Sequence, residues 1–139
     1  MSVLVGLDGS GRSTAALAYA AETFPSAPLV VFHAIDPFDR DPEDATAEPL
    51  TEAWLAEERE RVDRLFDRAI ADVELEGDRV RRETTVGKPA ESIVAFAEED
   101  DVETVVVGSY GLGEAERLRL GSVAETVVRR SPVPVIVVR

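Results

Sequence analysis

Short apolar runs that alternate with helix-patterned segments constrain this chain more than any other feature. Residues 3–7, 28–35, 104–107 and 133–138 are almost entirely apolar, and residues 79–86 mix β-branched side chains with charges. A strand covered on both faces gives a continuous apolar run, and such runs separated by helices are typical of a parallel sheet between two helical layers. The sequence therefore predicts a three-layer αβα sandwich around five parallel strands.

Four amphipathic helices are expected between these strands, the longest with an apolar stripe from Trp54 to Val73 and an end at Gly77. A residue that favours a helix boundary marks one end of each helix, at Pro25, Gly77, Pro89 and Ser122. Proline and glycine are expected to end the first and second helices. The second proline and the serine are expected to begin the third and fourth helices.

The chain has 139 residues, which suits a single domain over residues 1–139. It contains no cysteine, so disulfides, thiolate catalysis and Cys-ligated zinc are excluded. Its apolar runs are far shorter than the roughly 18 residues of a membrane span. No cationic segment precedes the first apolar run, so no secretory signal is expected and the predicted location is cytoplasmic.

The charge balance is strongly acidic. Asp and Glu number 28 against 15 Lys and Arg, which gives a formal net charge of −13. Phosphates of DNA or RNA would be repelled by such a surface, so nucleic-acid binding is not expected. Lys88 is the one lysine. High acid content with scarce lysine suits a cytoplasm of high salt, which gives the hypothesis of a halophilic source beside the plainer one of an ordinary acidic protein.

A glycine-rich loop after the fourth expected strand carries the strongest functional signal. Gly108 and Gly111 are separated by two residues, and nine residues separate Gly111 from Gly121, which is followed by Ser122. Glycines let backbone N–H groups approach phosphate oxygens, and a helix N-terminus adds unpaired amides with partial positive charge. The alternative is structural: the glycines turn the chain, and Ser122 caps the helix in a capping box with Glu125. The spacing alone leaves both readings open.

This loop resembles the Gly-x2-Gly-x9-Gly-Ser/Thr motif of the ATP-binding universal stress proteins. Residues 121–135, which read GSVAETVVRRSPVPV, are similar to the closing helix and strand of that family. The opening residues 3–10, VLVGLDGS, and residues 33–36, HAID, resemble its first strand with an Asp-x-Ser turn and the end of its second strand. The resemblance covers essentially the whole chain. It implies a sheet of strand order 3-2-1-4-5, similar to the adenine-nucleotide α-hydrolase fold.

The resemblance also implies which residues bind a nucleotide. The acid of the first turn would contact the adenosine, the second strand would border adenine, and the glycine loop would follow the ribose and phosphates. The amides and hydroxyl at the start of the last helix would hold the distal phosphates. The expected nucleotide-binding residues are Leu7, Asp8, Ala34, Gly108, Ser109, Gly111, Gly121, Ser122 and Val123.

The implied cofactor is ATP, with Mg²⁺ or Mn²⁺ on the phosphates in some members of the family. Tyr110 stands where many relatives have His or Arg, so the motif is intact but one possible cationic contact is absent. Asp8 has a simpler reading as well, because an Asp at a strand end often only bonds the backbone of its own turn. No residue is assigned a catalytic or metal-binding role.

Other patterns in the sequence are weaker functional signals. Gly9-x-Gly11-x-x-Thr14 with Asp36 is a poor dinucleotide fingerprint, because Thr14 replaces the third glycine. A P-loop is excluded, since Pro89 follows the lysine. The acidic, Pro-containing residues 36–49 lack the glycine of a calcium loop and are predicted to be an exposed loop. Three further residues have structural interpretations: His33 as a packed or hydrogen-bonded side chain, and Arg129 with Arg130 as a complement to the helix dipole.

Three functions remain open at this point. The first is a nucleotide-dependent regulator or sensor, the second a weak ATPase or nucleotidyl transferase, and the third an interaction module that works without nucleotide. Hydrolysis, if any, is expected to be slow, since only Asp8 is a candidate general base. Family resemblance also implies a homodimer through Val133 to Val138, an apolar strand that should be covered if it lies at a sheet edge.

Overall fold

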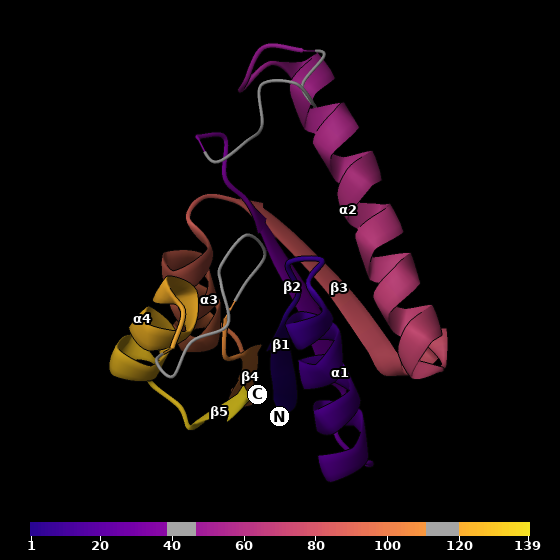
Figure 1. Ribbon diagram of the computed structural model, residues 1–139, viewed down its shortest axis with the longest axis vertical. Helices are drawn as coiled ribbons and strands as arrows, with labels where there is room; N and C mark the ends of the chain where they lie inside the picture. The colour runs from indigo at the N-terminus through magenta and orange to yellow at the C-terminus, as the bar shows by residue number, and fades with distance from the viewer. Residues whose placement is uncertain (39–46, 111–119) are drawn as a thin grey trace.

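The computed structural model describes residues 1–38, 47–110 and 120–139. The chain forms a five-stranded parallel sheet that lies between two pairs of helices (Figure 1). The strands run in the order β3-β2-β1-β4-β5, which confirms the expected fold. Their bounds are β1 Ser2–Gly6, β2 Leu29–Ile35, β3 Val80–Val86, β4 Val102–Gly108 and β5 Val135–Val138. The helices are α1 Gly11–Thr23, α2 Glu52–Val73, α3 Pro89–Glu99 and α4 Ser122–Arg130, with a short 3-10 helix, η1, at Gly77–Arg79.

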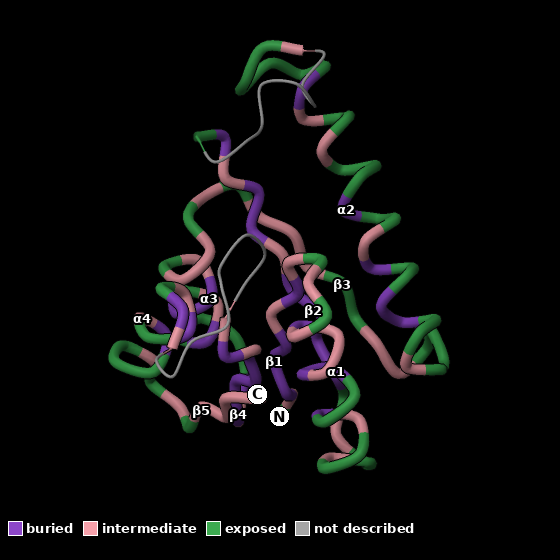
Figure 2. Tube along the Cα trace, viewed as in Figure 1, coloured by how far each residue is buried: buried purple, intermediate pink, exposed green. Residues whose placement is uncertain are grey.

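Two apolar clusters hold the layers together, one on each face of the sheet. Buried positions lie along the strands and recur along the helices (Figure 2). On one face α1 and α2 pack against alternate residues of the central strands, with Leu17 and Phe66 almost fully buried. On the other face α3 and α4 supply Ile93 and Val127. Strands β1 and β4 bury side chains on both faces, which explains why their sequences are continuously apolar.

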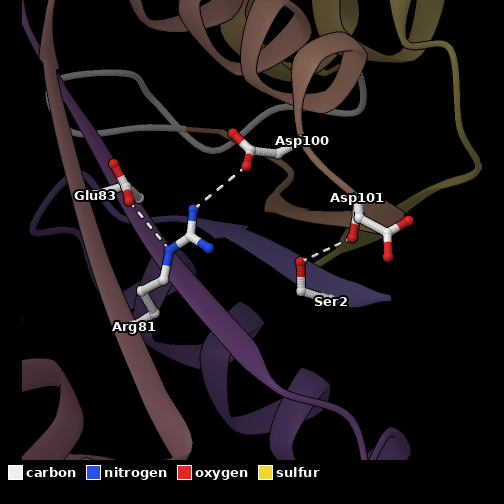
Figure 3. A network of polar contacts seen from close by, with 5 residues as sticks. All are labelled: Ser2, Arg81, Glu83, Asp100 and Asp101. Atoms are coloured by element: carbon white, nitrogen blue, oxygen red, sulfur yellow. Dashed lines mark hydrogen bonds and ion pairs between the residues drawn. The ribbon is translucent and has the colours of Figure 1, made fainter.

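The edge strand β3 is polar on its outer positions, as its mixed sequence predicts. Arg81 lies between Glu83, at 3.0 Å, and Asp100, at 3.6 Å, and thereby connects β3 to the end of α3 (Figure 3). Beside it, Ser2 Oγ donates a hydrogen bond to the Asp101 backbone carbonyl. Exposed ion pairs of this kind add little stability, but charged side chains on an edge strand discourage pairing with another chain.

One predicted helix end is wrong. Helix α2 ends at Val73 and not at Gly77, because Glu74 adopts a left-handed conformation at φ 59°. The Glu74 amide donates to Ala71 and Ile70, and the Leu75 amide donates to Ile70, so the last turn is closed before the glycine is reached. Gly77 instead begins the short helix η1.

Candidate functional site

The strand order places a topological switch point between β1 and β4. After β1 the chain passes through α1 to β2, which lies on one side of β1 in the sheet. After β4 it passes through α4 to β5, which lies in the opposite direction along the sheet. In open parallel sheets, ligands bind beyond the carboxyl ends of the strands at such a point. The segments of interest are therefore the turn after β1, the residues after β4, and the start of α4.

The turn after β1 is closed by its own polar side chains. Ser10 N–H donates to Asp8 Oδ1 at 2.8 Å, and Ser13 N–H donates to Ser10 Oγ at 3.2 Å, which makes Ser10 the N-cap of α1. Leu7 N–H donates to the Phe32 carbonyl at 2.8 Å and keeps the start of the turn on β2. The simpler reading of Asp8 as a turn residue is confirmed, and its contact with a nucleotide stays a prediction.

His33 holds the carbonyl that precedes this turn. Its Nδ1 lies 2.6 Å from Leu7 O, and because a carbonyl only accepts, we assign the ring proton to Nδ1. Burial lowers the pKa of His33, and Arg61 lowers it further, while the Leu7 hydrogen bond and the charges of Asp8 and Glu58 oppose the change. The prediction of a hydrogen-bonded histidine is confirmed, and burial favours the neutral form of the ring.

The end of β4 is joined to the start of α4 by one short backbone bond. Ser109 is buried, and its N–H donates to the Val138 carbonyl of β5 at 2.8 Å. Its carbonyl accepts from Gly121 N–H at 2.7 Å. Residues that are twelve positions apart in the sequence therefore meet at the carboxyl end of the sheet, and the N-terminus of α4 begins there.

Helix α4 is not capped as the structural alternative expected. Gly121 is the N-cap, no side chain caps the helix, and Ser122 is its exposed first residue. The carboxylate of Glu125 pairs with Arg129 at 2.9 Å, so the capping box predicted for Ser122 and Glu125 is wrong. Helix α4 begins at Ser122, as the sequence predicts, so Gly121 and not Ser122 occupies the N-cap position. The amide of Val123 lies in the first turn, where no carbonyl of the helix can accept from it.

Arg12 and Tyr110 connect the two loops at the switch point. Arg12 Nε donates to the Tyr110 hydroxyl at 2.9 Å, and the guanidinium carbon lies 5.2 Å from the centre of the tyrosine ring. The backbone of Arg12 also packs on Gly108, where an added Cβ would lie 3.0 Å from the Arg12 carbonyl carbon. No local sequence pattern relates Arg12 to Tyr110, which lies 98 residues away, so this contact could not be predicted from the sequence.

Three predicted site residues remain to be placed: Ala34, Val123 and Gly111. Ala34 is buried on β2, opposite Thr85 of β3, so it lies one strand away from the switch point. Val123 packs, half-buried, against the cluster on the α4 face. Gly111 lies outside the described residues, as does most of the acidic loop.

Neither a metal cluster nor a membrane helix is found in the described part of the chain. Within residues 1–38, 47–110 and 120–139, no three His, Asp or Glu side chains are grouped so that they could hold a metal ion. Over the same residues, every helix is too short or too polar to cross a bilayer. The donors at the switch point are backbone amides, hydroxyls and one guanidinium, a set that suits an anion.

A model of the universal stress protein family matches residues 1–139. The chain belongs to this family. A universal stress protein of Thermus aquaticus is 35% identical over 143 residues, which cover 99% of this chain and 98% of the relative. The solved structure of the universal stress protein UspA from Lactobacillus plantarum has a TM-score of 0.77 at 24% identity and covers 100% of this chain and 97% of its own, which supports the fold.

A further solved universal stress protein was crystallised in complex with cAMP. It is 27% identical to this chain, has a TM-score of 0.68, and the match covers 100% of this chain and 97% of that one. The family to which the chain belongs therefore includes a structural relative that binds an adenine nucleotide.

Proposed function

We propose that this universal stress protein binds ATP at the switch point between β1 and β4 and acts as a nucleotide-dependent regulator or sensor in a stress response. The observation that supports the proposal most directly is the 2.7 Å bond from Gly121 N–H to Ser109 O. It brings the N-terminus of α4, with its partial positive charge, to the end of the glycine-containing strand β4. The relative in complex with cAMP supports an adenine nucleotide as the ligand.

In this proposal the two loops have different tasks. Leu7 and Asp8 contact the adenosine from the turn after β1, and the backbone of Ala34 borders adenine. Gly108 and Ser109 follow the ribose and the first phosphate, together with Gly111.

The start of α4 holds the distal phosphates. Because Gly121 N–H already donates to Ser109 O, the amide of Val123 and the hydroxyl of Ser122 are the donors assigned to these phosphates, and Gly121 contributes close backbone approach. A divalent ion such as Mg²⁺ or Mn²⁺ would arrive with the phosphates and neutralise part of their charge.

Thermal unfolding with added nucleotide tests the proposal. A ligand that binds only the native state stabilises it by about 2.7 kcal/mol at a hundred times Kd, so millimolar ATP with Mg²⁺ should raise the Tm by several degrees. ADP, AMP and cAMP titrated in parallel rank the nucleotides. Mass spectrometry of ligand released from freshly purified, denatured protein reports what is bound in the cell. An unchanged Tm at millimolar ATP would remove the proposal.

The rival functions give different results in the same preparation. A weak ATPase or nucleotidyl transferase would show turnover that is lost in Asp8→Ala and Ser122→Ala. An interaction module would bind its partner equally well with and without nucleotide. A regulator instead binds ATP stoichiometrically, turns it over slowly or not at all, and changes its affinity for a partner when ATP is bound.

The assembly proposed for this function is a homodimer through the segment from Val133 to Val138. Strand β5 is the outer strand of the sheet beside β4, and its four residues are all partly exposed. A parallel edge strand with apolar side chains is a template for pairing with a second copy. Light scattering at micromolar concentration should give twice the 15.1 kDa chain mass, and a monomeric mass would contradict the dimer.

A further inference from the structure

The backbone of Arg12 is fixed at the switch point by close packing. Arg12 is the second residue of α1, and that helix starts directly after the Asp8 turn. At the end of β4, a Cβ built on Gly108 would lie 2.9 Å from Arg12 Cβ and 3.1 Å from the Arg12 carbonyl oxygen. Only a residue without a side chain permits this approach. The first turn of α1 therefore lies directly on the strand end that leads into the glycine loop.

The side chain of Arg12 is oriented by Tyr110. The phenolic oxygen accepts a hydrogen bond from Nε at 2.9 Å, and the guanidinium carbon lies 5.2 Å from the ring centre. A guanidinium has five N–H donors, and the bond to the tyrosine uses one of them. A guanidinium already oriented by such contacts loses less conformational entropy when it binds an anion.

The charges around this point make Arg12 distinctive. Across the described residues 7–13, 108–110 and 120–123, which form the two loops and the start of α4, Arg12 is the one basic side chain. The whole chain has a net charge of −13, whereas the phosphates of a nucleotide are anionic. A planar guanidinium matches two phosphate oxygens at once, which a backbone amide cannot do.

We infer that Arg12 binds the phosphate chain of the nucleotide. This inference rests on the proposed function and adds a residue to it that lies outside the glycine motif and comes from the opposite helical layer. Tyr110 positions the guanidinium through Nε. When the nucleotide binds, its phosphate oxygens replace the contacts that the rest of the guanidinium makes in the nucleotide-free protein. Asp8 contacts the uncharged adenosine end, so the two opposite charges bind different parts of the ligand.

Calorimetric titration with ATP, AMP and adenosine distinguishes a phosphate contact from a general effect on the site. In Arg12→Gln, ATP affinity should fall about ten- to a hundredfold, as expected for the loss of a charge-assisted hydrogen bond, while adenosine affinity stays within about twofold. Arg12→Lys should recover part of the loss, since it restores the charge without the planar fork. Tyr110→Phe keeps the ring but removes the acceptor, and should weaken ATP binding about threefold.

Arg64→Gln is the matched control, because it removes the same charge from an exposed position of α2. It should leave ATP affinity unchanged. If Arg12→Gln binds ATP as wild type does, or loses ATP and adenosine by the same factor, the inference about Arg12 is overturned while the proposed function stands. If wild-type protein binds neither ATP nor AMP, the proposed function and this inference fall together. If Arg12→Gln is poorly folded, Arg12→Lys and Tyr110→Phe keep the test decisive.

Discussion

Gly108→Ala is the substitution whose effect follows most directly from the geometry. The new Cβ would lie 2.9 Å from Arg12 Cβ, 3.0 Å from its carbonyl carbon and 3.1 Å from its carbonyl oxygen. Carbon atoms in ordinary contact are about 3.5–4.0 Å apart, so the methyl group overlaps its neighbours by roughly 0.5–1 Å. Two of these three atoms are backbone, so no side-chain rotation relieves the overlap. Helix α1 or the end of β4 must move.

The expected cost is that of overpacking a rigid site, about 1–3 kcal/mol of unfolding free energy. For a chain of this length that lowers the Tm by roughly 3–12 °C, measured by calorimetry or urea denaturation. The same movement separates the turn after β1 from the glycine loop. ATP affinity should therefore fall in Gly108→Ala at a temperature where the variant is fully folded.

Gly11→Ala provides the matched control. It is the same chemical change one residue before Arg12, but no atom lies within 4 Å of the added Cβ. At such a position alanine reduces the entropy of the unfolded chain and should stabilise the protein by about 0.4–1 kcal/mol. Equal stabilities of Gly108→Ala and wild type would refute the close approach of α1 to β4. A destabilised Gly11→Ala would show that the space around residue 11 is not open.

Two further predictions concern pH and salt. Because burial lowers the pKa of His33 below 6.5, the unfolded chain takes up the proton before the native state does, and stability falls as pH drops through 6.5 toward the native value. Urea denaturation from pH 7.5 to 5.5 should show wild type losing stability relative to His33→Gln, and parallel curves would contradict the assignment. The net charge of −13 predicts a Tm that rises from low salt to molar KCl, as the halophile hypothesis requires, and a Tm that stays flat would count against it.

Much of the architecture was predictable because each strand carries its own pattern. The central strands bury both faces, so their apolar runs gave the strand positions to within about two residues. Even the edge strand β3 could be recognised from its mixture of β-branched and charged residues. Parallel order followed from the helices between strands, whereas the order of the strands came from the family resemblance and not from the residues alone.

Where the predictions fail, the deciding conformation or contact is one that the residue preferences used for prediction do not reveal. Ser122 has the sequence of an N-cap, but it is the first residue of α4 and Gly121 takes the N-cap position. Gly77 has the sequence of a helix stop, but Glu74 takes the left-handed conformation three residues earlier. Arg12 belongs to a helix start with no motif, and only the folded chain brings it to a tyrosine 98 residues away.

An acidic protein can hold a polyanion if the attractive groups are close and the repulsive ones are distant. The acidic residues of α2 are mainly at exposed positions, and the exposed positions along this helix are green in Figure 2. At 0.1 M salt, an exposed charge more than about 10 Å from a bound phosphate would contribute little to its energy, because it is largely screened. A half-buried guanidinium in direct contact with phosphate is screened much less. Higher salt would therefore weaken the repulsion more than the attraction, so acidity over the rest of the surface and an anion site at the switch point are compatible in one protein.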